Sequence, residues 1–266
     1  MNHDELRQRY NPDGSLLRRQ QMRMLDILLE VDRICREHGI RYWLSSGTLI
    51  GAVRHGGFIP WDDDLDIEMM RADYLRLMQV LPRELPDWLA LQHADTDEYY
   101  FYFYAKVRDR RSRMLETLDY GRQLKEQGIF IDIFPIERHP IWLHRLTELT
   151  AGHMYKIWRT STDDRKAIRR VRRIFRLNRY VVYPLLRSFV ALFPFLKTLT
   201  SGMGIPFHNP RYGRDIFPLA TATFEGHQFP VPGNADQLLR RLYGDYMQLP
   251  DLSKLALHVA QLEFYD

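Results

Sequence analysis

Apolar side chains recur at helical spacing along residues 16–38, with charged side chains at intervening positions, so a helix is expected there. Gly39 is expected to stop this helix. Residues 40–44 are β-branched and aromatic, which predicts a buried strand running into a tight turn at residues 45–47. A short helix is expected to follow over residues 48–54.

Residues 55–61 (HGGFIPW) form a loop by their two glycines and their proline. The next residues alternate acidic and apolar side chains, which predicts a strand with Asp64, Asp66 and Glu68 on one face. A further helix is expected over residues 71–81, ended by a proline at position 82.

Two more strands are expected over residues 99–107 and 128–135, joined by a charged segment that we expect to be helical. Long helical patterns then run from residue 141 to about residue 197. Short strand signals occupy residues 224–231, and a final helix is expected over residues 235–243. These patterns predict an α/β (α+β) fold with a mixed β-sheet flanked by helices.

The chain of 266 residues is 45% hydrophobic and 27% charged, as is usual for a globular protein. Cys35 is the only cysteine, which excludes an intrachain disulfide and a cysteine-rich zinc site. The first ten residues are polar and do not resemble a secretory signal peptide. A cytoplasmic protein is therefore expected, with an option of peripheral contact at the inner face of the membrane.

Basic side chains are concentrated in residues 165–179, which carry eight of them and no acidic side chain. Removing these eight charges from the net +4 leaves the rest of the chain at −4. The apolar residues 180–199 follow, but Pro184, Arg187 and Pro194 interrupt them, which argues against a spanning helix.

Four interpretations of residues 165–199 stay open. The segment is an interfacial membrane contact, or a basic helix followed by a core helix. Its charges suit a polyanionic glycan or nucleotide donor as well, and nucleic acid is the weakest option and is not expected as a partner.

Four aspartates fall within residues 62–66, an arrangement that costs stability unless cations neutralise it. Asp64 and Asp66 could hold a pair of divalent ions, Mg²⁺ or Mn²⁺, with Asp132 from another strand completing the site. The alternatives are a solvated acidic turn for residues 62–66 and a structural ion pair with an arginine for Asp132.

Residues 42–67 (YWLSSGTLIGAVRHGGFIPWDDDLDI) closely resemble the signature of the LicD family, which includes bacterial phosphocholine transferases, and whose wider group contains fukutin and fukutin-related protein. The resemblance continues through residues 71–74 (RADY), residues 106–109 (KVRD), Asp132 within FIDIFP, and residues 243–250 (YGDYMQLP). It weakens between about residues 140 and 205.

This resemblance implies a nucleotidyltransferase-like mixed sheet with a helical insertion. It divides the chain into a catalytic core over residues 1–140, a basic and apolar helical insertion over residues 141–205, and a segment over residues 206–266 that completes the core. It also implies an enzyme that moves a phospho-alcohol, most commonly phosphocholine from CDP-choline, onto a sugar hydroxyl of a cell-surface glycan or glycolipid. Nucleotidylyl transfer to a small-molecule or sugar acceptor and non-catalytic nucleotide binding are the alternatives.

On this resemblance, the turn at Ser46, Gly47 and Thr48 would hold donor phosphates through backbone amides, while Asp64 and Asp66 bind metal. The turn departs slightly from the Gly-Ser pattern of the superfamily, and the 55–61 loop lengthens the gap to Asp64. Asp132 would bind metal or accept the proton of the acceptor hydroxyl.

Four cationic side chains are further candidates. Lys106 and Arg108 could neutralise donor phosphates, or they could pair with the excess carboxylates. The sequence supports the two roles equally. Arg54 and His55 reach the donor or orient an aspartate, although a histidine in a glycine-rich loop is more often solvated. The aromatic residues 99–104 pack in the core or cage a quaternary ammonium group such as choline.

Overall fold

The computed structural model describes residues 3–116, 124–160, 165–207, 209–253, 255 and 259–265. Two helices open the chain, α1 (His3–Tyr10) and α2 (Leu16–Glu37). The Ser15 hydroxyl caps α2 by accepting a hydrogen bond from the backbone N–H of Arg18 at 3.2 Å. Gly39 adopts a φ of +59° just after α2, so the predicted helix and its stop are confirmed.

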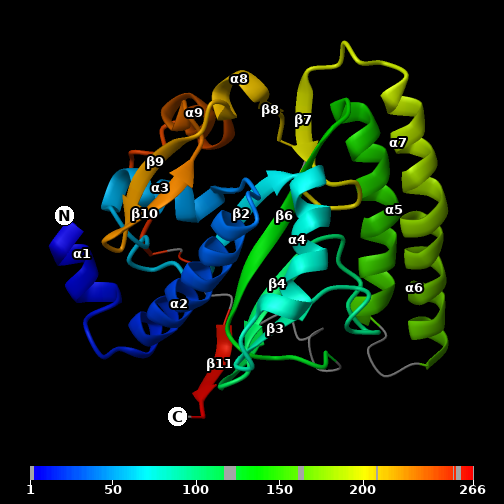
Figure 1. The fold of residues 1–266 in the computed structure, drawn as a ribbon. Helices are drawn as coiled ribbons and strands as arrows, with labels where there is room; N and C mark the ends of the chain where they lie inside the picture. Colours follow the sequence, from blue (N-terminus) through cyan, green and yellow to red (C-terminus); the bar gives the residue numbers. More distant parts are fainter. Residues whose placement is uncertain are drawn as a thin grey trace.

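A mixed sheet forms the centre of the molecule (Figure 1). Its main path runs in the order β1 (Trp43–Leu44), β2 (Asp66–Met70), β6 (Phe130–Arg138), β4 (Ala105–Asp109) and β3 (Leu89–Gln92). β2 and β6 are parallel, while the other neighbours on this path are antiparallel. The predicted fold class is confirmed, and the parallel pair places side chains of two distant segments at the same level.

Helices α3 (Ser46–His55) and α4 (Arg71–Glu84) follow β1 and β2. The prediction that Pro82 ends this helix after Leu81 was wrong by three residues, because α4 continues to Glu84. Proline lacks its own backbone N–H, but the carbonyls before it can still accept hydrogen bonds from later residues. The N–H of Leu85 donates to the carbonyl of Leu81 at 3.0 Å.

Two expected elements between residues 99 and 135 differ from the structure. Residues 99–104 lie outside any strand, because their aromatic rings pack on one another and on Tyr155, and only Ala105–Asp109 pairs as β4. The segment expected to be helical begins with β5 (Ser112–Glu116), which pairs with β11 (Val259–Phe264), and residues 117–123 lie outside the described residues. β5 depends on a partner far along the chain, which no local pattern reveals.

The long helical patterns after residue 140 are confirmed. They form α5 (Ile141–Thr160), α6 (Arg165–Leu177), the π-helical turn η2 (Asn178–Val182) and α7 (Tyr183–Ala191). β7 (Thr198–Ser201) then returns to the sheet and pairs with the end of β6, and β8 (Arg211–Tyr212) pairs with β7. β6 therefore extends three residues beyond the predicted strand, since β7 supplies its partner.

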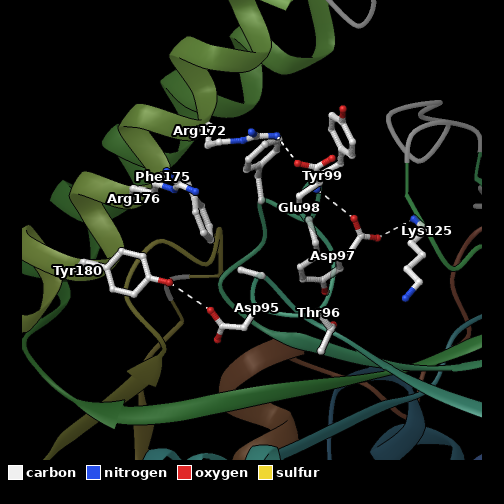
Figure 2. Close-up of a pocket in the computed structure, with 13 residues that line it drawn as sticks. Asp95, Thr96, Asp97, Glu98, Tyr99, Lys125, Arg172, Phe175, Arg176 and Tyr180 are labelled. Carbon is white, nitrogen blue, oxygen red and sulfur yellow. Dashed lines mark hydrogen bonds and ion pairs between the residues drawn. The ribbon is translucent and has the colours of Figure 1, made fainter. Parts of the chain in front are cut away.

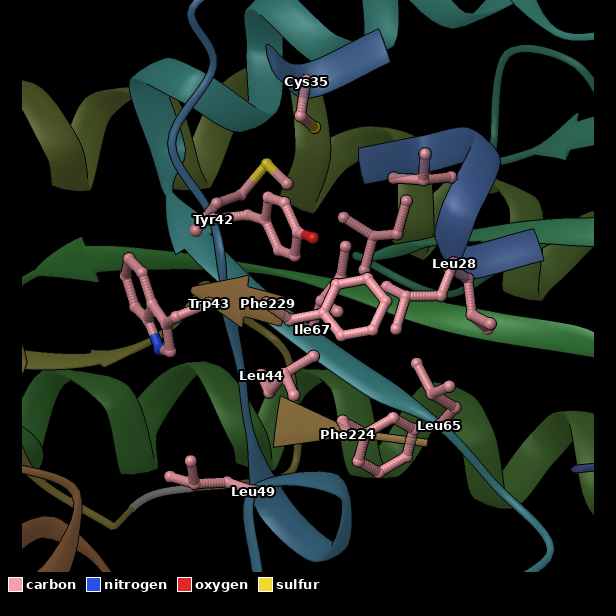
Figure 3. Packing of buried hydrophobic residues seen from close by; sticks show 14 of the residues in the cluster. Leu28, Cys35, Tyr42, Trp43, Leu44, Leu49, Leu65, Ile67, Phe224 and Phe229 are labelled. Atoms are coloured by element: carbon pink, nitrogen blue, oxygen red, sulfur yellow. The ribbon is translucent and has the colours of Figure 1, made fainter. Parts of the chain in front are cut away.

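The last part of the chain packs beside α3. It contains α8 (Gly213–Ile216), the hairpin β9 (Ala220–Phe224) and β10 (His227–Val231), and α9 (Ala235–Tyr243), as predicted from the 235–243 pattern. Phe224 and Phe229 of the hairpin join one cluster with Leu28 of α2 and Ile67 of β2 (Figure 3). The first and last parts of the chain thus share one hydrophobic core.

α2 and α4 cover one face of the sheet, where they contact β6. Ile67, Ile131 and Ile133 point towards these helices and belong to the same core cluster. Because successive side chains of a strand alternate between faces, Asp66 and Asp132 point to the opposite face. Within the described ranges, each helix falls short of the length and apolarity needed to cross a bilayer.

Candidate active site

Three side chains from three neighbouring strands form a row across the sheet. Asp66 of β2 is the register partner of Asp132 on β6, and Asp132 is in turn the register partner of Lys106 on β4. The Lys106 Nζ lies 3.1 Å from Asp132 Oδ1 and 3.4 Å from Oδ2. The sequence predicted that Asp66 and Asp132 converge, and the structure brings them together, with the Lys106 ammonium beside Asp132.

The acidic run enters this row from the loop before β2. β2 begins at Asp66, so the expected strand containing Asp64 starts two residues later than predicted. Glu68, expected on the same face, is buried in a bidentate ion pair with Arg211 and does not extend the acidic site. Asp64 remains within electrostatic range of Asp66 from the loop.

Burial, and then repulsion by neighbouring carboxylates, makes Asp66 and Asp62 hard to ionise. Loss of surrounding water raises the pKa of Asp66 well above its usual value, and the charges of Asp64, Asp132 and Asp62 raise it further. The pKa of Asp62 is raised well above its usual value by the same loss of water and by Asp64. A cation placed among these oxygens would remove the repulsion.

The turn at the start of α3 is fastened to Asp66. The Ser46 hydroxyl donates a hydrogen bond to the Asp66 carboxylate, which favours its ionised form. The backbone N–H of Asp66 donates to Thr48 Oγ1 at 2.9 Å. A Cβ on Gly47 would lie 2.6 Å from Asp62 Oδ2, so the glycine allows that carboxylate to approach the helix terminus. The predicted turn residues and aspartates therefore form one site.

Asp62 is a member of this site that the sequence identified only as part of the acidic run. Its position against Gly47 and its hydrogen bond to Asp64 set it apart from Asp63, which accepts a hydrogen bond from the Val259 N–H at 3.2 Å. The run of four aspartates is the signal in the sequence, but it does not distinguish the two.

The 55–61 loop is held in place by the β9–β10 turn. Glu225 accepts a hydrogen bond from the Phe58 N–H at 3.0 Å and forms a bidentate ion pair with Arg18 of α2. The Glu225 N–H donates to the carbonyl of Gly56 at 2.9 Å. These contacts fix the loop that delivers the chain to the aspartates.

Arg54 and His55 lie at the other end of α3. The Arg54 guanidinium donates to His55 Nε2 at 2.9 Å and to the carbonyl of Tyr246 at 2.6 Å, and Asp62 lies within its electrostatic range. Arg54 thereby ties α3 to the chain after α9. Donor binding by Arg54 and His55 stays a prediction.

Tyr243, at the end of α9, is a site residue to which the sequence gave no role. Its hydroxyl is hydrogen-bonded to Ser46, while loss of surrounding water and the charge of Asp66 raise its pKa. Tyr243 lies in the stretch YGDYMQLP, and that match was the only signal available. The end of the chain therefore supplies one wall of the site.

Lys106 and Arg108 have different surroundings although both project from β4. The buried Lys106 ammonium lies 3.1 Å from the centre of the Phe130 ring, on the same side as Asp132. Arg108 is 2% exposed and donates to Gln92 Oε1 at 2.5 Å and to the carbonyl of Gly128 at 2.8 Å. Of the two predicted roles, Lys106 shows pairing with a carboxylate. A role of Arg108 in donor binding stays a prediction.

An aromatic wall extends from this row towards the insertion. We define it as Tyr102, Tyr104, Phe134 and Tyr155. Tyr104 stacks near Phe134 at 4.5 Å between ring centres, Tyr102 lies 5.2 Å from Tyr104, and Tyr155 of α5 lies 5.6 Å from Tyr102. Asp132 is close enough to raise the pKa of Tyr104 further after loss of surrounding water has raised it.

A cavity of about 660 Å³ opens between the 94–101 loop and α6 (Figure 2). The Arg172 guanidinium reaches across it to Glu98 at 3.1 Å, and the Tyr180 hydroxyl donates to Asp95 at 3.2 Å. Tyr100 lines the cavity and lies within electrostatic range of Asp132. Among the residues that line the cavity, Tyr100 is the link to Asp132, and the carboxylates of the row do not line it.

The carboxylates fit a hard divalent cation by the chemistry of their oxygen donors. In the described ranges, however, no three Asp, Glu, His or Cys side chains are already arranged around one ion position. The Lys106 ammonium lies beside Asp132, at the place where a third ligand was predicted. The donor set therefore matches Mg²⁺ or Mn²⁺ in kind, and binding requires the carboxylates to adjust.

Comparison with known proteins identifies the family of this chain. Residues 39–166 match a family model described as LicD/FKTN/FKRP, nucleotidyltransferase domain. The lipopolysaccharide cholinephosphotransferase LicD of Haemophilus influenzae is 31% identical over 255 residues, which cover 88% of this chain and 92% of that protein.

Two shorter similarities fall on smaller segments. An uncharacterized protein of Rickettsia prowazekii is 39% identical over 80 residues, covering 30% of this chain and 29% of that protein. The human ribitol 5-phosphate transferase FKRP is 54% identical over 35 residues, which cover 13% of this chain and 7% of that protein. The chain belongs to the LicD family, as a LicD-type phosphotransferase.

Proposed function

We propose that this protein transfers phosphocholine from CDP-choline to a sugar hydroxyl of a cell-surface glycan, using Mg²⁺ or Mn²⁺. The observation that carries the proposal is the register pair Asp66 and Asp132, with Asp62 and Asp64 beside it. Burial and the neighbouring carboxylates raise the pKa values of Asp66 and Asp62, and a divalent cation among these oxygens would relieve their repulsion. The similarity to a lipopolysaccharide cholinephosphotransferase supports choline as the alcohol.

Asp64, Asp66 and Asp132 would hold the metal, which supplies positive charge for the donor diphosphate when bound. The amides of Gly47 and Thr48 at the start of α3 would bind phosphate oxygens, helped by the dipole of that ten-residue helix. Asp62 lies against this same helix end. A donor phosphate bound there would lie close to several carboxylates. Because all of these groups are negatively charged, cations would be needed between them.

The chemistry proposed is a displacement at the phosphorus that carries choline. The oxygen of the acceptor hydroxyl forms a bond to this phosphorus, the bond to the bridging oxygen breaks, and CMP leaves with the bonding electrons. Asp132 accepts the proton of the hydroxyl or binds metal, and Lys106 at 3.1 Å stabilises its negative charge before the reaction. Ser46 orients Asp66 through its hydroxyl.

The aromatic wall supports choline among the possible alcohols. Ring faces attract a quaternary ammonium group, whereas ribitol or glycerol would need hydrogen-bonding partners. Tyr102 and Tyr104 are half-buried residues, and Tyr104 lies close enough to Asp132 for that carboxylate to raise its pKa after burial has raised it. The cavity between the 94–101 loop and α6 would receive the glycan acceptor.

The test is product formation from CDP-choline and a lipopolysaccharide acceptor with Mg²⁺ or Mn²⁺, followed by mass spectrometry. Asp66→Asn and Asp132→Asn should each lower kcat at least about a hundredfold, by analogy with the loss of other groups that stabilise charge during reaction. Asp87→Asn is the matched control, because Asp87 is an exposed aspartate outside the candidate active site. Equal activity in all four proteins would contradict the mechanism.

The identity of the transferred half separates this proposal from the runner-up. Nucleotidylyl transfer would attach CMP to the acceptor and release phosphocholine, whereas the proposed reaction releases CMP. Screening CDP-choline, CDP-ribitol, CDP-glycerol and CDP-ethanolamine for metal-dependent thermal stabilisation identifies the alcohol. Stabilisation by a nucleotide without any turnover would favour a binding protein on the same fold.

A further inference from the structure

Helices α6 and α7 form one continuous rod, joined by the π-helical turn η2, along the side of the molecule opposite α1 (Figure 1). One side of this rod is buried. Val171 and Phe175 pack against Phe101 and α5, and Tyr183 and Val190 pack in a cluster with Leu143. The rod is therefore packed against the rest of the protein at both ends, and its other side faces outward.

Three arginines on the inner side form ion pairs with acidic residues outside the rod. Arg172 contacts Glu98, Arg179 contacts Asp95, and Arg187 forms a bidentate pair with Glu137. These pairs account for the inward basic residues of the segment as architectural contacts. They do not explain the basic residues on the outer side.

The outer side of α6 is a basic row. Arg169, Arg170, Arg173 and Arg176 are exposed and, with Lys166, line a shallow open hollow that reaches Arg172 at its inner edge. The sequence contains no Asp or Glu from residue 165 to residue 214, so no acidic residue follows them in this segment. Like charges this dense repel one another and favour an anionic partner.

The outer side of the rod continues as an apolar row beyond α6. Leu177, Val181, Leu185 and Phe189 recur every four residues, which places them along one stripe. Together with two exposed apolar residues further along the chain, they form a set whose members are 48% to 72% exposed: Leu177, Val181, Leu185, Phe189, Leu192 and Phe195. Large apolar side chains in such a row usually mark an interaction surface.

An exposed tryptophan lies at the same end of the insertion. Trp142 of α5 is next to Leu143, which packs in one cluster with Val190 near the end of α7. Tryptophan prefers the boundary between water and hydrocarbon. The rod thus carries basic residues along its first half and apolar residues, with Trp142 nearby, along its second half.

We propose that this outer surface of α6 and α7 docks onto an anionic lipid bilayer. The basic row binds lipid phosphates while Leu185, Phe189, Leu192 and Phe195 enter the boundary of the acyl chains. A soluble polyanion would match the charges and leave the apolar row uncovered. A symmetric contact of this surface with the same surface of a second copy would place the basic row against another basic row or an apolar one, so its charges would stay unmatched.

The test is co-sedimentation of the full chain with two kinds of vesicle, phosphatidylcholine alone and phosphatidylcholine with about 30% phosphatidylglycerol. We expect binding to the anionic vesicles, weakened by added salt, and little binding to the neutral ones. The double variant Arg170→Glu/Arg173→Glu should lower the partition coefficient by about tenfold or more, since each basic residue contributes to attraction at the surface. Leu185→Asp/Phe189→Asp should lower it similarly.

Matched controls change similar side chains elsewhere. Arg83→Glu reverses an exposed charge on α4, and Leu16→Asp alters an exposed leucine at the start of α2. Both should bind vesicles like the unaltered protein. All variants affect exposed residues outside the candidate active site, so unchanged circular dichroism and transfer to a soluble acceptor show that they fold.

Several outcomes would overturn the proposal. They are absence of binding to anionic vesicles, equal binding to both vesicle types, and equal loss of binding in the control variants. Self-association that Leu185→Asp/Phe189→Asp abolishes, without vesicle binding, would assign the surface to a second copy of the chain. Binding of a soluble anionic glycan in place of vesicles would assign it to that ligand.

Discussion

Asp66 and Asp132 are register partners on the parallel strands β2 and β6, although 65 residues separate them in the sequence. Parallel pairing fixes them at one level of the sheet and on one face. Lys106 extends the same level on β4. The sheet therefore holds two acids and one base in line, and the charge balance of this line underlies the first prediction.

Replacing Lys106 by methionine removes the ammonium beside Asp132. We expect the free energy of unfolding at pH 7 without metal to fall by about 3 kcal/mol, because breaking a buried ion pair leaves a charge uncompensated. If Asp132 binds metal, Mg²⁺ should then stabilise Lys106→Met more than the unaltered protein, since the competing ammonium is gone. Guanidinium unfolding with and without Mg²⁺ measures both effects.

Lys125→Met is the control for this experiment, because Lys125 is exposed and should change the free energy of unfolding by less than about 0.5 kcal/mol. A Mg²⁺ effect that is the same in Lys106→Met and the unaltered protein would count against Asp132 as a metal ligand. The ion pair would then be its whole role.

Ser46 combines a positive φ of 48° with a hydroxyl that donates to Asp66. Ser46→Gly removes the hydroxyl and relieves the backbone, while Ser46→Ala removes the hydroxyl alone. We expect Ser46→Gly to be more stable than Ser46→Ala by about 1 kcal/mol, because left-handed backbone penalises a Cβ. Both should lose transferase activity, by about tenfold, if the hydroxyl orients Asp66. Full activity in Ser46→Gly would show that only the backbone matters.

Replacing glycine by alanine should have opposite effects on stability at Gly51 and at Gly152. A Cβ on Gly51 would collide with the backbone carbonyl of Gly57, so Gly51→Ala should displace the 55–61 loop and cost about 1–3 kcal/mol. Gly152 lies in α5 with nothing within 4 Å of such a Cβ, so Gly152→Ala should stabilise the protein by about 0.5–1 kcal/mol. Thermal unfolding compares them, and equal effects would mean that the loop does not press on α3.

His139 makes stability depend on pH. Burial lowers the pKa of His139 to about 4, below its ordinary value of 6.5, so the unfolded chain binds the proton first as the pH falls. The native state should therefore lose roughly 2 kcal/mol between pH 7 and pH 5 from this group alone. Denaturant unfolding at these two pH values, in the native protein and in His139→Gln, measures the contribution.

His153→Gln, at an exposed histidine on α5, is the matched control and should keep the native pH dependence. His139 accepts or donates hydrogen bonds with Thr200 Oγ1 at 2.7 Å and His144 Nδ1 at 3.0 Å, so glutamine retains some of that bonding. An unchanged pH dependence in His139→Gln would reject this assignment.

Local patterns predicted most of the helices well, because helical spacing is a property of a single segment. The 235–243 pattern matches α9 at both ends, and the 16–38 pattern matches α2 to within a residue. Strands were less predictable wherever their partners are distant. Pairing with β11 and β7 decides β5 and the end of β6, and neither partner is visible from the strand itself.

The candidate site shows the same division. The acidic run and an aspartate flanked by isoleucines were enough to predict that Asp66 and Asp132 meet. The contact between Lys106 and Asp132 and the hydrogen bond between Tyr243 and Ser46 depend on register and on the packing of α9. Aromatic residues 99–104 suggested a strand because rings favour strands, yet tertiary packing recruits those rings into the wall instead.

The clamp that Glu225 makes on Phe58 and Arg18 joins positions far apart in the order of synthesis. A growing polypeptide therefore leaves the ribosome with its aspartates already made but the loop before them unfastened. The loop that delivers the chain to the aspartates can take its final position only once the β9–β10 turn has been synthesised.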